Sequence, residues 1–266
     1  LMAEPIKDLP DLPPRLDQAI LDPLITSEQL LEGCDAGCQE NVRAICTTLQ
    51  HLPALRERLG GKDGPRLIAA IGFPFGALPQ TLKQNEAEWA AAHGADELDV
   101  VPDFTALING QSGVFAEELA LICGLGLPVR VILDMARLPQ ELLPVAVEAA
   151  IDAGAAGVQT GNGFGPPASS EQIEALKPLC RGRCAIKAAG GIHSLEQVLA
   201  LVQAGASLLG TSSAPQLLRQ LRRPAHHKRH GELRVLSYPD KIGDYFWESS
   251  TDPTSSTGGA HGRHDH

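Results

Sequence analysis

The stretch His-Gly-Ala-Asp-Glu-Leu-Asp-Val-Val at 93–101 joins the end of a helix to the start of a buried strand. Glycine takes the left-handed conformation that ends a helix at low cost, and the chain then enters the next strand. The same junction recurs as Ala-Gly-Ala at 153–155 and 204–206. This repeated unit of helix, Gly-Ala and strand predicts a fold built from successive strand–helix pairs.

Short apolar runs alternate with helical patterns along the chain, and we expect each run to form a strand. The runs lie at about 15–18, 42–47, 67–72, 96–101, 128–134, 156–160, 184–189 and 207–212. Runs this apolar are typical of strands buried on both faces, as in a parallel sheet. Capping-box patterns predict helix starts at 26–29, 169–172 and 194–197.

Strand–helix alternation on this scale indicates an α/β fold, either a (β/α)8 TIM barrel or an open doubly wound sheet. No Gly-x-Gly-x-x-Gly motif follows the first strand, which favours the TIM barrel. We place the barrel at 15–223, after an N-terminal extension at 1–14. The segment 224–266 is rich in His, Ser and Gly, and we expect a disordered tail there.

Composition narrows the class of partner. The 32 acidic and 22 basic side chains give a formal net charge of −10, which disfavours nucleic acid. No apolar run reaches the roughly 18 residues that span a bilayer, and no basic-then-apolar leader opens the chain. The six cysteines lack metal-binding spacing. We therefore expect a cytoplasmic protein with reduced thiols, no metal and no membrane partner.

The active site of a TIM barrel forms at the carboxyl ends of its strands. The polar residues expected there are Asp17, Cys46, Asp99, Arg130, Asp134, Gln159, Lys187 and the Ser212–Ser213 pair. Lys187 is the most informative, because a lysine in an apolar strand is seldom buried without a partner or a function. It either faces a substrate as a cation or pairs with Asp99 or Asp134 as part of the scaffold.

Small residues follow the sixth, seventh and eighth strands, at 161–163, 190–191 and 210–213. Such loops let backbone N–H groups approach an anion, and Pro215 suits the first turn of a short helix at about 214–222, whose dipole would help. The alternative is a set of ordinary turns. We predict a phosphate-binding site formed by Gly163, Gly190, Gly191, Ser212 and Ser213.

Several motifs together resemble the deoxyribose-phosphate aldolase family, collinearly over about 15–222. They are Leu-Asp-x-x-x-Leu-x-Pro (16–23), Ile-Gly-Phe-Pro-Phe-Gly (71–76), Gly-Ala-Asp-Glu-Leu-Asp-Val-Val (94–101), Val-Arg-Val-Ile-Leu-Asp (129–134), Ala-Ile-Lys-Ala-Ala-Gly-Gly-Ile (185–192) and Gly-Thr-Ser-Ser (210–213). The resemblance implies a (β/α)8 class I aldolase that cleaves 2-deoxyribose 5-phosphate to acetaldehyde and glyceraldehyde 3-phosphate, without metal or cofactor.

The resemblance also implies roles for individual residues. Lys187 matches a lysine that lowers the pKa of the imine-forming lysine, and Asp99 matches an aspartate that assists proton transfer. The residues expected to contact the sugar are Asp17, Cys46, Arg130 and Asp134.

This chain departs from the family pattern at the catalytic position. Gln159 stands where the family has the imine-forming lysine, and an amide nitrogen has no basic lone pair with which to form an imine. Four further positions near it depart from the residue that many members have. They are Gln18 in place of His, Arg130 in place of Lys, Asp134 in place of Glu and His193 in place of Arg.

Three functions stay open on the sequence. The first is a working aldolase in which Lys187 forms the imine. The second is a binding protein or regulator that keeps the phosphate site and has lost the chemistry. The third is another phosphosugar reaction, such as an enolisation with Asp99 and Lys187 as acid and base. Each requires a small phosphorylated sugar as partner, and family members are often dimeric, so a homo-oligomer is also an expectation.

Overall fold

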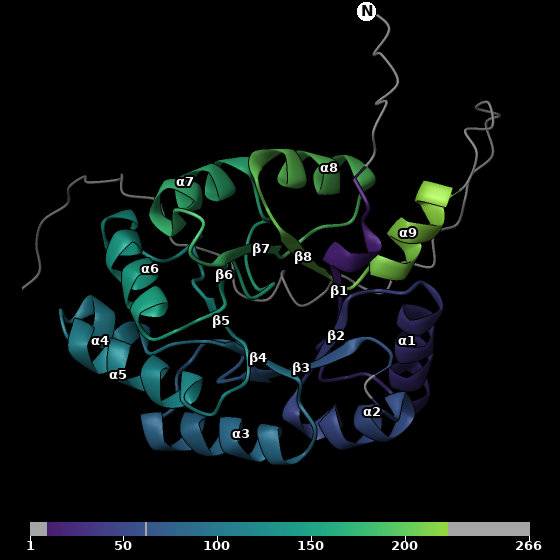
Figure 1. The fold of residues 1–266 in the computed structure, drawn as a ribbon, viewed down its shortest axis with the longest axis horizontal. Helices are drawn as coiled ribbons and strands as arrows, with labels where there is room; N and C mark the ends of the chain where they lie inside the picture. Colours follow the sequence, from purple (N-terminus) through teal and green to yellow (C-terminus); the bar gives the residue numbers. More distant parts are fainter. Residues whose placement is uncertain (1–9, 62, 223–266) are drawn as a thin grey trace, which may run out of the picture. The chain divides into compact units, whose positions relative to one another are not determined.

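A computed structural model describes residues 10–61 and 63–222, which form a closed barrel of parallel strands (Figure 1). The strands are β1 (Leu16–Ile20), β2 (Ala44–Thr47), β3 (Arg66–Ile71), β4 (Glu97–Val100), β5 (Val129–Ile132), β6 (Gly157–Gln159), β7 (Ala185–Ala189) and β8 (Leu208–Thr211). Because β1 pairs with both β2 and β8, the sheet closes on itself. The TIM-barrel prediction is confirmed, and the open sheet is excluded.

Helices surround the strands on the outside of the barrel (Figure 1). They are α1 (Ser27–Gln39), α2 (Leu52–Leu59), α3 (Gln80–Ala92), α4 (Phe104–Ile108), α5 (Ser112–Cys123), α6 (Leu143–Asp152), α7 (Ser170–Cys180), α8 (Leu195–Ala204) and α9 (Ala214–Arg222). The three predicted capping boxes are formed, at Thr26, Ser169 and Ser194. The short helix predicted at about 214–222 is also present.

The glycines that follow three of the helices have the predicted left-handed backbone. Their φ angles are 95° at Gly94, 89° at Gly154 and 119° at Gly205. A side chain at Gly205 would also collide with α7, since its Cβ would lie 2.8 Å from Lys177 Cδ. The left-handed backbone thus explains why glycine ends these three helices, and close packing adds a second reason at Gly205.

Side chains alternate between the helical layer and the interior of the barrel, which we call the lumen. The outward-facing residues are apolar and buried, and they include Leu16, Ile45, Leu67, Leu98, Val131, Val158, Ile186 and Leu209. One side of the lumen is apolar too, formed by a separate cluster of Ala44, Cys46, Ile68 and Ala70. Strands β1, β4, β5 and β7 direct charged side chains into the lumen, and these define the site described below.

The first strand differs slightly from its predicted bounds of 15–18. A 3-10 turn at Pro13–Arg15 precedes it, and it continues to Ile20, which pairs with Thr47. The predicted tail at 224–266 and residues 1–9 of the predicted extension lie outside the described residues. Within the described residues, no helix has the length and apolar character needed to cross a membrane.

Candidate active site

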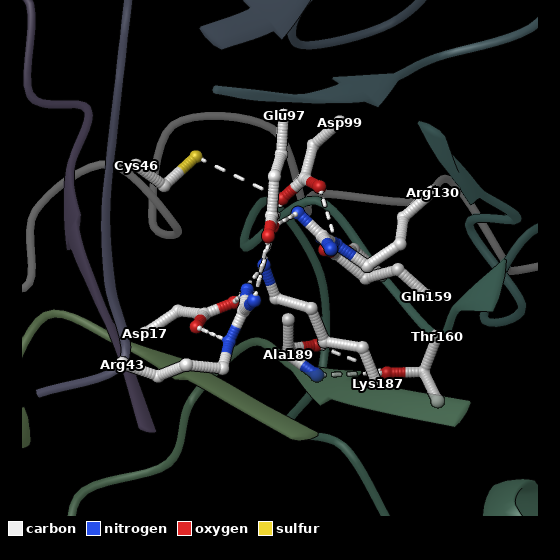
Figure 2. A network of polar contacts seen from close by, with 11 residues as sticks. Asp17, Arg43, Cys46, Glu97, Asp99, Arg130, Gln159, Thr160, Lys187 and Ala189 are labelled. Carbon is white, nitrogen blue, oxygen red and sulfur yellow. Dashed lines mark hydrogen bonds and ion pairs between the residues drawn. The ribbon is translucent and has the colours of Figure 1, made fainter. Parts of the chain in front are cut away.

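Lys187 lies on β7 with its side chain in the lumen and is 2% exposed. Its Nζ is 2.8 Å from Asp17 Oδ2 and 2.7 Å from Asp99 Oδ2 (Figure 2). Burial lowers the pKa of Lys187, but the two carboxylates outweigh it and raise the pKa above its ordinary value. The amine is therefore held as an ammonium ion. Of the two partners considered from the sequence, Asp99 pairs with Lys187, whereas Asp134 pairs with Arg137.

Arg130, on β5, neutralises two carboxylates of β4. Its Nε lies 2.7 Å from Asp99 Oδ1, and its Nη2 lies 2.7 Å from Glu97 Oε2. Burial lowers the pKa of Arg130, and the neighbouring carboxylates of Asp99 and Glu97 more than compensate. The pKa of Asp99 is lowered as well: burial raises it, but Arg130 and Lys187 hold the carboxylate in its charged form.

Arg43, which immediately precedes β2, completes the set of charges. Its Nε and Nη2 donate to the two carboxylate oxygens of Asp17 at 2.7 and 2.9 Å. Its Nη1 lies 3.0 Å from each oxygen of Glu97. Burial alone would raise the pKa of Asp17, but Lys187 and then Arg43 lower it to about 2.

These contacts join into what we call the lumen network: Asp17, Arg43, Glu97, Asp99, Arg130 and Lys187 (Figure 2). It contains equal numbers of carboxylates and cations, so its formal charge is zero. Sequence reasoning missed Arg43, because the residues that it contacts, Asp17 and Glu97, lie on distant segments of the chain. Glu97 lies two residues before Asp99 and therefore faces the same side of β4, but it was not among the residues expected at the site.

Two strand glycines make room for these side chains. A Cβ at Gly157 would lie 3.1 Å from Arg130 Cγ, and a Cβ at Gly210 would lie 3.0 Å from Lys187 Cε. Gly210 is on β8, between β7 and β1, so its missing side chain lets Lys187 reach Asp17 across the intervening strand. Glycine within a strand is a sequence signal for such close approach.

Gln159 lies on β6 beside Lys187, its register partner on β7. Its Nε2 donates to the carbonyl of Gly161 at 2.7 Å, while its Oε1 is buried without a hydrogen-bond partner among the described residues. The Gln159 side chain therefore has a fixed amide nitrogen and an acceptor oxygen left over. Gln159 offers no nucleophilic nitrogen at this level of the barrel.

Cys46 and Asp134 lie at the edges of the site. The Cys46 thiol donates weakly to Asp99 Oδ2 at 3.8 Å, and burial raises the pKa of the thiol. Asp134, at the end of β5, accepts a hydrogen bond from Arg137 and has a left-handed φ of 48°. It borders a shallow surface hollow, whose other lining residues include Ala136, Thr160, Asn162, Gly163 and Gln172.

The loops after β6, β7 and β8 lie side by side at the mouth of the barrel, the end formed by the carboxyl ends of the strands. A Cβ at Gly190 would lie only 3.6 Å from Gly163 Cα. His193 Nδ1 lies 3.3 Å from Ser213 Oγ, which connects the last two loops. The structure thus brings the predicted phosphate-binding residues together.

Unused backbone donors mark this group of loops. The N–H groups of Gly163, Gly190, Gly191 and Ser212 donate to no acceptor among the described residues. The start of α9 contributes less than predicted, because the N–H groups of Ser213 and Ala214 donate to Thr211 Oγ1 and Gln18 Oε1. We call Gly163, Gly190, Gly191, Ser212 and Ser213 the glycine cradle.

An aromatic cluster lies next to Gly163 at the mouth. The Phe164 ring packs edge-on against Phe73 and Phe75, with centroids 5.9 and 5.5 Å apart. Asn162 Nδ2 donates to the carbonyl of Pro74 at 2.8 Å, and the Arg137 guanidinium lies 5.0 Å from the centre of the Phe75 ring. Sequence reasoning singled out the 71–76 motif but not its partner Phe164, which comes from a loop distant in the chain.

No cluster of three or more His, Cys, Asp or Glu side chains within residues 10–61 and 63–222 has the arrangement of a metal site. The charged side chains of the lumen instead neutralise one another. The arrangement therefore combines an edge of unpaired backbone N–H groups with an ammonium ion and neutral hydrogen-bonding groups.

The chain is similar to known aldolases in sequence and in fold, although no family model matches it. It is 37% identical over 215 residues to the deoxyribose-phosphate aldolase of Trichormus variabilis, covering 80% of this chain and 95% of that protein. Among solved structures, "QR15, an Aldolase" has a TM-score of 0.76 at 29% identity, covering 80% of this chain and 96% of that one. The tetrameric deoxyribose phosphate aldolase of Aeropyrum pernix has a TM-score of 0.71 at 30% identity, covering 79% and 91%.

Proposed function

Because the chain belongs to the deoxyribose-phosphate aldolase family, we propose that it binds a small phosphosugar of the 2-deoxyribose 5-phosphate class at the mouth of its barrel. We further propose that it binds this sugar without the imine chemistry that would cleave it to acetaldehyde and glyceraldehyde 3-phosphate. Two neighbouring features carry the proposal. The glycine cradle presents free N–H groups, and Lys187, the only amine in the lumen among the described residues, is a fully paired ammonium ion.

The phosphate end of the ligand is assigned to the glycine cradle. Free N–H groups on adjacent loops are suitable donors to a phosphate, and loops seven and eight are the usual phosphate site of TIM barrels. Gly163 and Gly190 lie close enough for their N–H groups to serve one phosphate. The cradle thus accounts for binding of an anion by a chain with net negative charge.

The sugar end is assigned to the lumen face formed by Gln159, Lys187 and Asp99. The unpaired Gln159 Oε1 is an acceptor for a sugar hydroxyl, and burial makes leaving it unpaired costly. Asp17, Arg130 and Asp134, which were predicted to contact substrate, are engaged by Lys187, Asp99 and Arg137. We assign Asp17 and Arg130 to positioning Lys187 and Asp99, and Asp134 and Cys46 to the edge of the sugar site.

The state of Lys187 disfavours the other two functions. An imine requires a free amine, yet deprotonating Lys187 would leave Asp17 and Asp99 facing each other with one cation fewer. Enolisation requires a base, yet both oxygens of Asp99 are paired and its pKa is lowered.

The deciding experiment compares the parent chain with Gln159→Lys. The lumen network is already balanced, so the introduced amine would face Lys187 and Arg130 without a spare carboxylate, and its pKa should fall. We expect the parent to bind 2-deoxyribose 5-phosphate without turnover. The variant should release aldehyde at least about a hundredfold faster than the background rate of the parent, which is part of the 10⁴–10⁶ that a lost nucleophile accounts for.

Gln159→Met is the matched control, because it has similar length and no amine. This variant should neither cleave the sugar nor be trapped by borohydride. Added 2-deoxyribose 5-phosphate should still raise its melting temperature. Turnover by the parent chain, with borohydride trapping at Lys187, would contradict the proposal.

We also propose that the chain forms a homo-oligomer. This is supported by the tetrameric assembly of the Aeropyrum pernix relative and by half-exposed apolar side chains on α3 and α5, including Trp89 and Leu121. Sedimentation velocity tests the assignment, and a monomer across micromolar concentrations would exclude it.

A further inference from the structure

Gln18 and Thr211 lie beside the turn that leads from β8 into α9. They are register partners on the neighbouring strands β1 and β8, and they are 6% and 5% exposed. Asp17 points into the lumen towards Lys187, so the next residue of β1, Gln18, points to the other side of the sheet. The lumen network therefore does not use Gln18.

The Gln18 amide bonds to the turn with both of its polar atoms. Its Nε2 donates to the carbonyl of Ser212 at 3.0 Å, and its Oε1 accepts from the N–H of Ala214 at 3.1 Å. The opposite orientation of the amide would set acceptor against acceptor and donor against donor, so only this orientation satisfies both bonds. A buried side chain thus fixes the backbone on both sides of Ser213.

Thr211 supports the same turn from β8. Its hydroxyl donates to the carbonyl of Ile192 at 2.6 Å and accepts from the N–H of Ser213 at 3.0 Å. Because Ile192 directly follows Gly190 and Gly191, the Thr211 hydroxyl joins the loop after β7 to the loop after β8. The two loops that supply most of the glycine cradle are therefore held together from below.

These bonds occupy the donors that a helix ordinarily offers to an anion at its amino end. The N–H groups of Ser213 and Ala214 are both paired, and Pro215, which follows them, has no N–H. By contrast, the N–H of Ser212 donates to no acceptor among the described residues, and this residue is exposed. The available donor thus lies one residue before the turn into α9.

We propose that Gln18 is a positioning residue for the phosphate end of the ligand. It occupies the N–H of Ala214 and holds the carbonyl of Ser212. The phosphate is thereby directed to the N–H groups of Ser212 and of the glycines after β6 and β7, and away from the amino end of α9. This inference rests on the proposed function, since it requires the glycine cradle to bind phosphate.

Strand β1 then supports both ends of the ligand. On the lumen side, Asp17 holds Lys187 with a distance of 2.8 Å between Oδ2 and Nζ. On the other side, the next residue, Gln18, holds the turn that carries Ser212. Because successive residues of a strand face opposite sides, this one strand sets the separation between the ammonium ion and the phosphate site.

Amide chemical shifts of the nitrogen-15-labelled full-length chain test which N–H groups meet the phosphate. The probes are inorganic phosphate and 2-deoxyribose 5-phosphate. In the parent chain we expect the amides of Gly163, Gly190, Gly191 and Ser212 to shift most on titration with either probe. The amide of Ala214 should stay nearly constant, because Gln18 already accepts its hydrogen bond.

Gln18→Met has a similar length and makes neither hydrogen bond. We expect the Ala214 amide to join those that shift, and the affinity for both probes to fall roughly three- to tenfold, the effect of one or two hydrogen bonds. If Gln18→Met does not fold, Gln18→Asn takes its place, because it keeps an amide that ends one methylene short of the turn. Gln220→Met, on the exposed side of α9, is the matched control and should change neither measurement.

The outcomes separate this inference from the proposed function. A lower melting temperature for the Gln18 variant, with unchanged affinity and the same shifting amides, would show a purely structural role and overturn the inference alone. A parent chain in which neither probe shifts the amides of the glycine cradle would contradict the phosphate site itself, and the proposed function with it.

Discussion

Lys187 and Lys83 are both fully buried lysines, and they are placed in different layers of the barrel. Lys187 lies in the lumen between two carboxylates, with two arginines in the same network. Lys83 lies on α3, outside the strands, with Nζ 2.6 Å from Glu118 of α5 and 3.3 Å from the carbonyl of Val101. Burial and an ion pair are common to both, so neither property identifies a functional site.

The surroundings of Lys83 explain its burial through structure alone. Glu118 also accepts a hydrogen bond from the N–H of Asp103 at 2.8 Å, and a Cβ at Gly72 would lie 2.7 Å from Lys83 Cδ. The pair thus fixes the loops that leave β3 and β4. What distinguishes Lys187 is its position below the carboxyl ends of the strands, next to Gln159.

The largest effect is expected for Lys187→Met. Removing the ammonium ion leaves Asp17 and Asp99 buried with a missing counter-charge, so the free energy of unfolding should fall by about 3–5 kcal/mol. Urea denaturation at neutral pH measures the loss. The double variant Lys187→Met/Asp17→Asn should lose less stability than the sum of the two single losses. If Lys187→Met alone lost less than about 1 kcal/mol, the lumen network would not be coupled.

A smaller loss of about 3 kcal/mol is expected for Lys83→Met, because a single carboxylate loses its partner. The double variant Lys83→Met/Glu118→Leu should recover most of that stability, since an apolar pair can replace an isolated buried ion pair. The same denaturation assay compares the two. A double variant as unstable as the sum of its single changes would place Glu118 in a wider network, like that of Lys187.

The acid dependence of stability provides a further test of the lumen network. The pKa of Asp17 is lowered to about 2, so its stabilising effect is complete above its unfolded pKa near 4 and is lost as the pH falls towards 2. We expect this residue to account for roughly 2 kcal/mol over that range. Denaturation curves between pH 5 and 2 provide the measurement, and Asp17→Asn should remove this part of the slope.

The smallest effect is expected at an exposed pair, Arg58 and Asp35, whose side chains are 50% and 38% exposed. Water screens such a pair, so Arg58→Met should change the free energy of unfolding by no more than about 1 kcal/mol. This variant sets the baseline for the two buried lysines. A change as large as that of Lys83→Met would indicate that the assay reports something other than buried charge.

The sequence predicted much of the fold and part of the site. Gly94, Gly154 and Gly205 and the capping boxes of α1, α7 and α8 depend on local backbone geometry, so they could be read without tertiary contacts. Lys187 and Asp99 were found because they are charged residues within apolar strands, and the glycine cradle because small residues follow the last three strands in order. Arg43 and Phe164 were missed because their contacts come from distant segments.

By itself, then, the sequence determined the order of strands and helices, the residues at the strand ends and the absence of a lysine at position 159, since each is a property of a short stretch of chain. Only the tertiary structure decided that Lys187 is a paired ammonium ion. Closure of the barrel brings β1 next to β8, and Gly210 leaves the space through which Lys187 reaches Asp17. Charge compensation in a buried site depends on which strands meet, and short-range sequence patterns do not contain that information.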